Sequence, residues 1–300
     1  MKRVVFLIMV VGLVGMVGCD RHDDTTDNPI NPSVGGFDQN GASNAVFTVA
    51  SGRTVKFSKG NLQYQASTGT WRFAEHQYDC IGADNANISS AYSGWIDLFG
   101  WGTSGWNGSF AVCYQPWATS TSSFDYWIGG VSSYNLTEAY TNADWGVYNA
   151  ISNGGNQSGM WRTLTKDEWS YLLDGRGSAY RYALANVNGV NGLIIFPDTF
   201  TIPVGVTITN INVISTSYGY SSNIYTESQW NQMESCGYIF LPAAGDRSGT
   251  EVNHVGTYGL YWSSSYNDRY DALCMFFFSG YACMNYGSRY SGLSVRLVRD

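Results

Sequence analysis

The chain has 300 residues and a formal charge of −7, with 13% charged and 16% aromatic residues. This length suffices for one large domain or two small ones. The acidic balance disfavours a phosphate-backbone partner, so we expect no nucleic acid. Abundant glycine and aromatic residues with few charges are typical of short strands and tight turns, and long amphipathic helices are not expected.

The N-terminus has the pattern of an export signal. Lys2 and Arg3 precede an apolar run over residues 4–17, which is too short to span a bilayer but suits a signal peptide. Residues 16–19, Met-Val-Gly-Cys, resemble a lipobox, the site at which bacterial signal peptidase II cleaves. The resemblance implies a lipoprotein signal peptide over residues 1–18 and a membrane anchor through lipidated Cys19. The alternative is an ordinary signal peptide with a chance cysteine.

Residues 19–45 are polar, contain Pro and Gly, and show no hydrophobic periodicity. We therefore expect a disordered tether in this segment. The pair Asp23-Asp24 is similar to the acidic export tag of surface lipoproteins in Bacteroides-type bacteria. That resemblance implies a lipid-anchored protein at the cell surface, on the outer membrane.

The remaining residues, 46–300, show no large shift in composition, so we expect one domain. Residues 46–78 predict a β-meander whose inward positions alternate along the chain. These inward positions are Val55, Phe57, Leu62, Tyr64, Trp71 and Phe73.

Two capping boxes predict short helices further along. Thr165 with Glu168 begins a helix that ends at Gly175 and buries Trp169, Leu172 and Leu173. Thr226 with Gln229 begins another, which ends at Gly237 and buries Trp230 and Met233. Strands follow at 193–196 and 238–241. Few short helices, many short antiparallel strands and long irregular loops indicate an α+β fold.

The cysteines give no clear framework. If Cys19 carries lipid, an odd number remains, without the close spacing of a zinc or redox site. We expect buried thiols, with one bridge between Cys80 and Cys113 as the alternative. The remaining cysteines are Cys80, Cys113, Cys236, Cys274 and Cys283.

The last forty residues alternate like a strand with two unlike faces. Leu273, Met275 and Phe277 are expected in the core, whereas Cys274, Phe276 and Phe278 would face outward. Exposed phenylalanine and cysteine are costly unless they contact a partner, which predicts a ligand-binding face here. The alternative is that residues 276–278 are all buried, which leaves as exposed aromatic residues Tyr266, Tyr270, Tyr281, Tyr286 and Tyr290. Trp262 is expected to close the core.

The last strand carries two arginines. Arg296 and Arg299 are expected to pair with an acidic residue such as Glu168 or Asp246.

Four segments together resemble one superfamily. Residues 161–173 are similar to the helix segment of formylglycine-generating-enzyme-like domains, a branch of the C-type lectin fold, with Arg162, Leu164, Thr165, Glu168 and Trp169 matching and Thr163 intervening. Residues 237–250, 259–266 and 288–300 resemble closing segments of the same superfamily, especially the Fibrobacter major paralogous domain family. The resemblance implies a C-type lectin-like fold over residues 46–300. In that fold the early and last strands lie close, and a late loop and strand form the ligand face.

Some members of this fold are variable proteins of diversity-generating retroelements, in which adenine mutagenesis rewrites codons near the C-terminus. AAY codons yield Tyr, Asp, Ser, Cys, Phe or Arg, but never Lys, Glu, Gln, Met or Trp. Met275 and Met284 would then be fixed scaffold. The candidate ligand-binding residues compatible with AAY codons are Tyr266, Asn267, Asp268, Arg269, Tyr270, Asp271, Cys274, Phe276, Phe278, Tyr281, Cys283, Asn285, Tyr286, Ser288 and Tyr290.

An enzymatic function has less support. No segment matches the catalytic motif of the formylglycine-generating enzyme, although Cys274 and Cys283 could supply a thiol pair. A Ser-His-Asp relay has no support beyond His254 near Asp246. No P-loop, dinucleotide fingerprint or H-x-x-x-H motif occurs.

We therefore predict a surface lipoprotein that binds a protein or glycan ligand, without catalysis or a cofactor. A formylglycine-generating-type oxidase and a structural or fimbria-associated surface protein are the alternatives. Calcium is an option as a bound ion, with oxygens from Asn142, Asp144, Asn267, Asp268 and Asp271.

Overall fold

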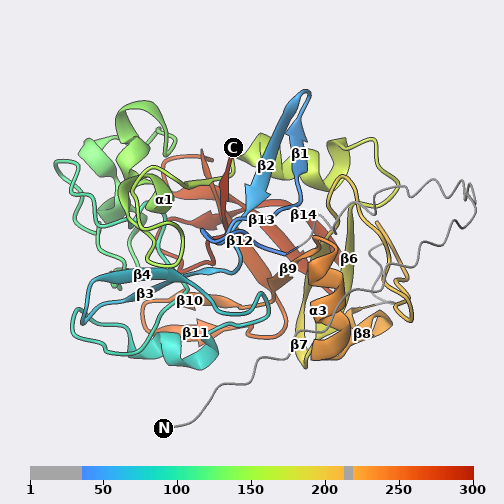
Figure 1. Ribbon diagram of the computed structural model, residues 1–300. Coiled ribbons are helices and arrows are strands. Elements are labelled where there is room, and N and C mark those ends of the chain that lie inside the picture. The colour runs from blue at the N-terminus through green and yellow to red at the C-terminus, as the bar shows by residue number, and fades with distance from the viewer. Residues whose placement is uncertain (1–35, 213–218) are drawn as a thin grey trace, which may run out of the picture. The chain divides into compact units, whose positions relative to one another are not determined.

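The computed structural model describes residues 36–212 and 219–300, shown in colour in Figure 1. The signal peptide and Cys19 lie outside these residues. Helices are few and short: α1 (Trp145–Tyr148), α2 (Lys166–Ser170) and α3 (Glu227–Ser235). The strands are many and mostly antiparallel, so the α+β class is confirmed. Within the described ranges, no helix is long and apolar enough to span a membrane.

The domain starts earlier than predicted. Residues 36–45, which we expected in the tether, already pack on it: Gly36 N donates to Glu234 O at 3.0 Å, and Ala42 and Ser43 are buried. Phe37 and Ser43 form a β-bridge with each other, and Ala42 forms one with Ser58. The segment was predicted as a tether because its composition is polar and its few buried residues, such as Ala42 and Ser43, are small.

The predicted meander is two hairpins in different sheets. The strands β1 (Phe47–Ala50) and β2 (Arg53–Phe57) form one, and β3 (Leu62–Gln65) and β4 (Thr70–Phe73) form the other. The strand β2 does not pair with β3. It pairs with the last strand, β15 (Leu297–Arg299), which also pairs with β5 (Arg162–Thr163). All of the predicted inward positions are buried, and Figure 1 shows the β1–β2 hairpin beside the C-terminus.

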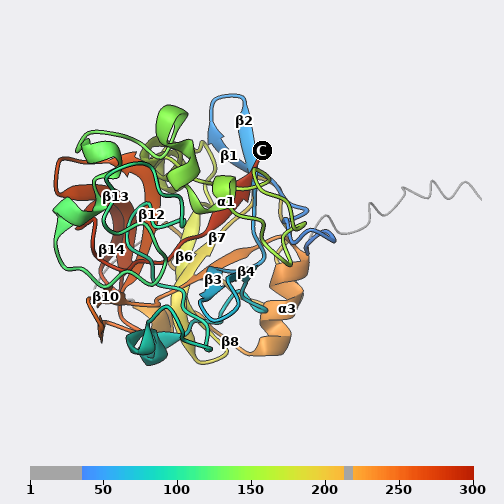
Figure 2. The same cartoon turned by 90° about the vertical axis from the view of Figure 1, so that its left-hand side faces the viewer.

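A second sheet has the order β8-β6-β7-β9, from β6 (Tyr182–Val187), β7 (Val190–Ile195), β8 (Ile224–Tyr225) and β9 (Ile239–Pro242). Helix α3 covers one face, where Trp230 and Met233 join a cluster with Ile194 and Phe240. Figure 2 shows α3 on the opposite side of the domain from the strands β12–β14 described next.

The third sheet has the order β12-β13-β14, from β12 (Gly259–Tyr266), β13 (Asp271–Phe278) and β14 (Tyr281–Ser288). A short hairpin, β10 (Asp246–Ser248) with β11 (Glu251–Asn253), precedes it. The central strand β13 lies between two hydrophobic clusters: Met275 and Phe277 belong to one, Ala272 and Cys274 to the other. The chain therefore buries both sides of this strand.

Both capping boxes are confirmed. The Thr165 hydroxyl accepts from Glu168 N while the Glu168 carboxylate accepts from Thr165 N, and Thr226 and Gln229 do the same. After Ser170, α2 continues as a π-helical turn over Tyr171–Gly175. The apolar residues predicted on these helices, Trp169, Leu172, Leu173, Trp230 and Met233, are all buried.

The predicted partners of the last two arginines were wrong. Arg299 pairs with Asp38, with Nη2 and Oδ2 2.6 Å apart. Arg296 is completely buried and donates to Gln77 Oε1 at 2.7 Å, a neutral acceptor. Glu168 instead pairs with Arg53 on β2 and Arg162 on β5, the two strands that flank β15.

The cysteines of the described part are all free thiols, so the Cys80–Cys113 bridge does not form. Only Cys274 is fully buried, and the others are partly exposed. Trp262 is fully buried as predicted, and its indole nitrogen donates to Phe99 O at 2.7 Å.

Candidate ligand-binding face

The register of β13 and β14 distributes the candidate residues over two opposite faces. Phe276 pairs with Cys283 and Phe278 with Tyr281, whereas Met275 pairs with Met284. We call these the Phe276 face and the Met275 face. The Phe276 face also carries Cys274 and Asn285, and the Met275 face carries Asp271, Tyr286 and Ser288. The expectation that all candidates share one face was therefore wrong.

Two candidates are also not available to a ligand. Cys274 is completely buried with Trp262 and Leu293, and Phe276 is only 8% exposed. Burial raises the pKa of the Cys274 thiol to about 12, and burial also raises that of Cys283. Thiols with raised pKa values are poor nucleophiles near neutral pH. The two faces alternate as predicted, but packing on both sides of the sheet buries Cys274 and Phe276 as well as Met275 and Phe277. Leu273, which we expected in the core, is only partly buried.

The outer part of the Phe276 face is a self-packed aromatic cluster. Tyr258 lies edge-on to Phe276 and Phe278, with ring centroids 5.3 and 5.9 Å apart. Phe278 in turn packs on Tyr281 at 4.6 Å, and only Tyr281 is widely exposed, at 43%. Edge-to-face pairs of this kind stabilise one another. Among these four rings the accessible one is therefore Tyr281.

His254 ends the same cluster. Its ring stacks on Tyr258 at 4.3 Å, and its Nδ1 lies 2.6 Å from Asp246 Oδ1. The predicted proximity of His254 and Asp246 is confirmed, but no hydroxyl hydrogen bonds to the imidazole within the part of the chain that the structure describes.

The turn between β12 and β13 gathers five candidates, Tyr266, Asn267, Asp268, Arg269 and Tyr270, which are all exposed. Asp268 shapes the turn, because its Oδ1 accepts from the backbone N–H groups of Tyr270 at 2.7 Å and Asp271 at 2.9 Å. The Arg269 guanidinium lies 4.5 Å from the centre of the Tyr270 ring. The turn thus presents two tyrosines on an ordered backbone.

A loop far away in sequence supports this turn. The Trp127 indole nitrogen donates to Arg269 O at 2.6 Å, and Phe124 packs edge-on against Tyr270 at 5.5 Å. Phe124 is itself 55% exposed. Neither residue was predicted, because nothing local in the sequence connects this loop to the turn.

Arg289 holds the turn in place from the interior of the domain. It is completely buried, and its Nη2 donates to Asp268 O at 2.7 Å and to Ser132 O. Its guanidinium lies over the rings of Trp101 and Tyr134, at 4.9 and 5.1 Å. Burial lowers the pKa of the guanidinium. No local pattern in the sequence indicates this role of Arg289.

Two cavities flank Tyr266. The smaller, of about 240 Å³, is lined by Tyr134, Glu138 and Tyr140, and the larger, of about 450 Å³, by Thr165, Asp167 and Leu273. Tyr266 and Asn135 line both cavities, and Asn135 Oδ1 accepts from Tyr266 N at 3.1 Å.

Hydroxyl, amide and carboxylate groups dominate the linings of the two cavities, which we together call the groove around Tyr266. This groove can hydrogen bond a polar ligand, while Tyr266 supplies an aromatic ring for stacking.

Tyr286 extends this region. It is 59% exposed and pairs across the strands with Leu273, which lines the larger cavity. Ser288 lies beside it on the same face and donates to Asp271 Oδ1 at 3.1 Å. Tyr281, Cys283 and Asn285 point to the opposite face. Tyr290 is partly buried beyond the end of β14.

The residues considered for calcium do not all come together. Asp144 is buried, and its carboxylate accepts from the N–H groups of Gly146 and Thr163, so it caps α1 and holds β5. Across residues 36–212 and 219–300, no group of three or more His, Cys, Asp or Glu side chains is placed to hold a metal ion.

Comparison with models of known protein families identifies the family of this chain. Residues 119–298 match the model of DUF8237, a domain of unknown function, and the chain belongs to this family. The match includes the Phe124–Trp127 loop, the turn at 266–271 and Arg289. Searches of curated proteins and of solved structures find no match.

Proposed function

We propose that this protein is a surface-displayed lipoprotein that binds a protein or glycan ligand through the turn at residues 266–271 and the groove around Tyr266. One observation carries the proposal: Tyr266 and Tyr270 stand more than one-third exposed, at 36% and 37%, on a turn held by buried Arg289. Exposed tyrosines on a rigid support bind well, because they give contact area and a hydroxyl at small entropic cost.

Burial of the neighbouring residues supports the same site. Tyr261, Trp262, Met275 and Phe277 are completely buried, so the sheet has no need of the exposed rings for its core. The two cavities beside Tyr266 provide concave surface, which a flat strand alone would lack. Tyr286 borders this region, and Tyr281 would belong to a separate contact area on the other face.

A C-type lectin-like fold remains part of the proposal. It is supported by the pairing of β2 with β15, because the early and last strands are expected to meet in that fold. The confirmed capping box of α2 lies within the segment that resembles this superfamily. Placement at the cell surface depends on the lipobox-like Met16–Cys19 and the acidic pair at Asp23-Asp24.

The proposal is tested with the full chain on a glycan array and on an array of purified extracellular proteins. Replacing Tyr266 and Tyr270 by Ala should abolish any signal of the wild type and lower the melting temperature by less than about 3 °C. The matched control is Tyr148→Ala, because Tyr148 is 42% exposed on α1, outside the turn, and should change neither. Retained binding in the double variant, or equal loss in the control, would refute this site.

Tyr281→Ala and Tyr286→Ala locate the boundary of the site. Loss of binding with Tyr286→Ala alone is expected, since Tyr286 is the cross-strand neighbour of cavity-lining Leu273. Loss with Tyr281→Ala alone would move the binding site to the Phe276 face.

A further inference from the structure

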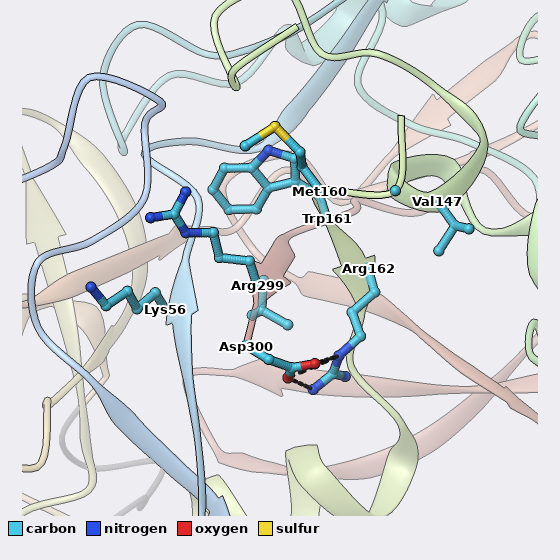
Figure 3. Close-up of a pocket in the computed structure, with 9 residues that line it drawn as sticks. Lys56, Val147, Met160, Trp161, Arg162, Arg299 and Asp300 are labelled. Atoms are coloured by element: carbon cyan, nitrogen blue, oxygen red, sulfur yellow. Dashed lines mark hydrogen bonds and ion pairs between the residues drawn. The ribbon is translucent and has the colours of Figure 1, made fainter. Parts of the chain in front are cut away.

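A separate cavity of about 530 Å³ lies beside the β1-β2-β15-β5 sheet, which contains strands from both ends of the domain. It is lined by β2, β5 and β15 and by the loop at residues 159–161, so it is built by other elements than the proposed binding face. Its exposed apolar surface comes from Val147 and Met160, with buried Trp161 and Val298 behind them. Figure 3 shows Trp161 and Met160 above the cavity and Asp300 below it.

Positive charge gathers at one edge of this cavity. Lys56 and Arg299 are directly opposite each other on the paired strands β2 and β15, and their side chains extend to the same side (Figure 3). Like charges directly opposite in a sheet destabilise it unless an anion is near. Arg299 has one carboxylate partner, Asp38, at 2.6 Å. Lys56 makes no ion pair with any residue in the described ranges, in a chain whose net charge is −7.

The opposite edge of the cavity is neutralised. Arg162 binds Asp300 at 2.6 Å and Glu168 at 2.8 Å, and the pair with Arg162 lowers the pKa of the Asp300 carboxyl. The Asp300 side chain therefore already has its counter-ion and does not compensate Lys56. The cavity thus combines an unpaired ammonium group, a second cation and an apolar wall.

We propose that this cavity binds a small organic carboxylate. The carboxylate would lie between Lys56 and Arg299, and the apolar or ring-shaped body of the ligand would pack on the partly exposed side chains of Met160 and Val147. A carboxylate accepts charge-assisted hydrogen bonds from both cations, which relieves their mutual repulsion. Burial of the apolar body of the ligand adds to the affinity in proportion to the apolar surface removed from water.

The test uses benzoate and acetate as probes of the full chain, followed by two-dimensional amide NMR at constant ionic strength. Benzoate should give saturable shifts at Lys56, Met160 and Arg299 with millimolar affinity, and acetate should bind at least about fivefold more weakly because it lacks the apolar body. Lys56→Met should weaken benzoate binding about tenfold, the loss expected for one charged hydrogen bond.

The matched control is Lys59→Met, which changes the net charge equally but removes a lysine paired with Glu75 at 3.4 Å. It should leave benzoate binding unchanged. Unsaturable shifts, equal affinity for acetate and benzoate, or equal effects of the two lysine variants would each overturn the proposal. Well-dispersed spectra of each variant establish that the fold is intact.

Discussion

Replacing Arg289 by Met should loosen the turn that carries Tyr266 and Tyr270. The variant loses the two hydrogen bonds from Nη2 to Asp268 O and Ser132 O, and both carbonyls lose a charged donor. Hydrogen bonds from charged donors contribute about 1.5–3 kcal/mol each. Part of this is offset, because Nε and Nη1 of Arg289 are buried without a partner in the described part of the chain, and Met carries no such desolvation penalty.

We expect a net loss of about 2–4 kcal/mol in the free energy of unfolding. For a domain of this size this lowers the melting temperature by about 5–15 °C. Hydrogen exchange measured by mass spectrometry should show faster exchange at residues 266–271 than the global loss of stability explains. Arg289→Lys should be intermediate, because an ammonium group keeps the charge but not the planar fork.

Arg296→Met is the matched control, since Arg296 is equally buried but donates to Gln77 Oε1. It should lower stability and leave the local exchange of the turn at the global rate. If Arg289→Met is as stable as the wild type and the turn exchanges normally, the role given to Arg289 is wrong.

Three further predictions concern other parts of the molecule. Burial raises the pKa values of the Asp97 and Asp144 carboxyl groups to about 6, so between about pH 4 and 6 the folded state keeps protons that the unfolded state releases. The free energy of unfolding should therefore fall as the pH rises from about 4 to about 6, by about 3 kcal/mol for each group. Asp97→Asn should remove its share of this pH dependence in urea titrations. Gly245→Ala should cost about 2–4 kcal/mol in thermal unfolding, because Gly245 has a φ of 78° and an added Cβ would meet Asn253 O, whereas Gly177→Ala, in open space, should be neutral. Cys19→Ser should release the protein from the membrane fraction, and retained sedimentation of that variant would contradict the lipid anchor.

Local signals in the sequence predicted local structure well. Both capping boxes were correct because each is a reciprocal hydrogen bond between residues three apart, which no distant contact needs to complete. The inward positions of the first two hairpins, such as Val55 and Trp71, were also correct, because one side of each hairpin packs on the core.

The candidate site was predicted only in part, for a physical reason. Period-2 alternation separates the two faces of β13 but does not say whether a second layer covers the outer one. Here Cys274 meets a second hydrophobic cluster, so it is buried although its alternation suggested exposure. The supports of the turn, Trp127 and Arg289, come from distant segments and leave no mark in the sequence near residue 268.

The burial of each candidate residue makes the retroelement hypothesis more specific. If the codons are diversified, the near-copy of the 3′ end should carry AAY at the codons of the exposed turn positions, and related copies of the gene should vary little at buried Cys274. A reverse-transcriptase gene with a near-copy of the 3′ end beside this gene would support diversification.

The way in which the turn is attached determines what can change on it. Arg289 Nη2, Arg289 N and the Trp127 indole end on the main-chain oxygens of Asp268, Tyr270 and Arg269. Main-chain oxygens are the same for every amino acid, so these attachments tolerate any residue other than proline at 269 and 270. Only Asp268 contributes its own carboxylate to the backbone of the turn. The turn is therefore a suitable site for grafting or randomised libraries, provided that Asp268 is kept.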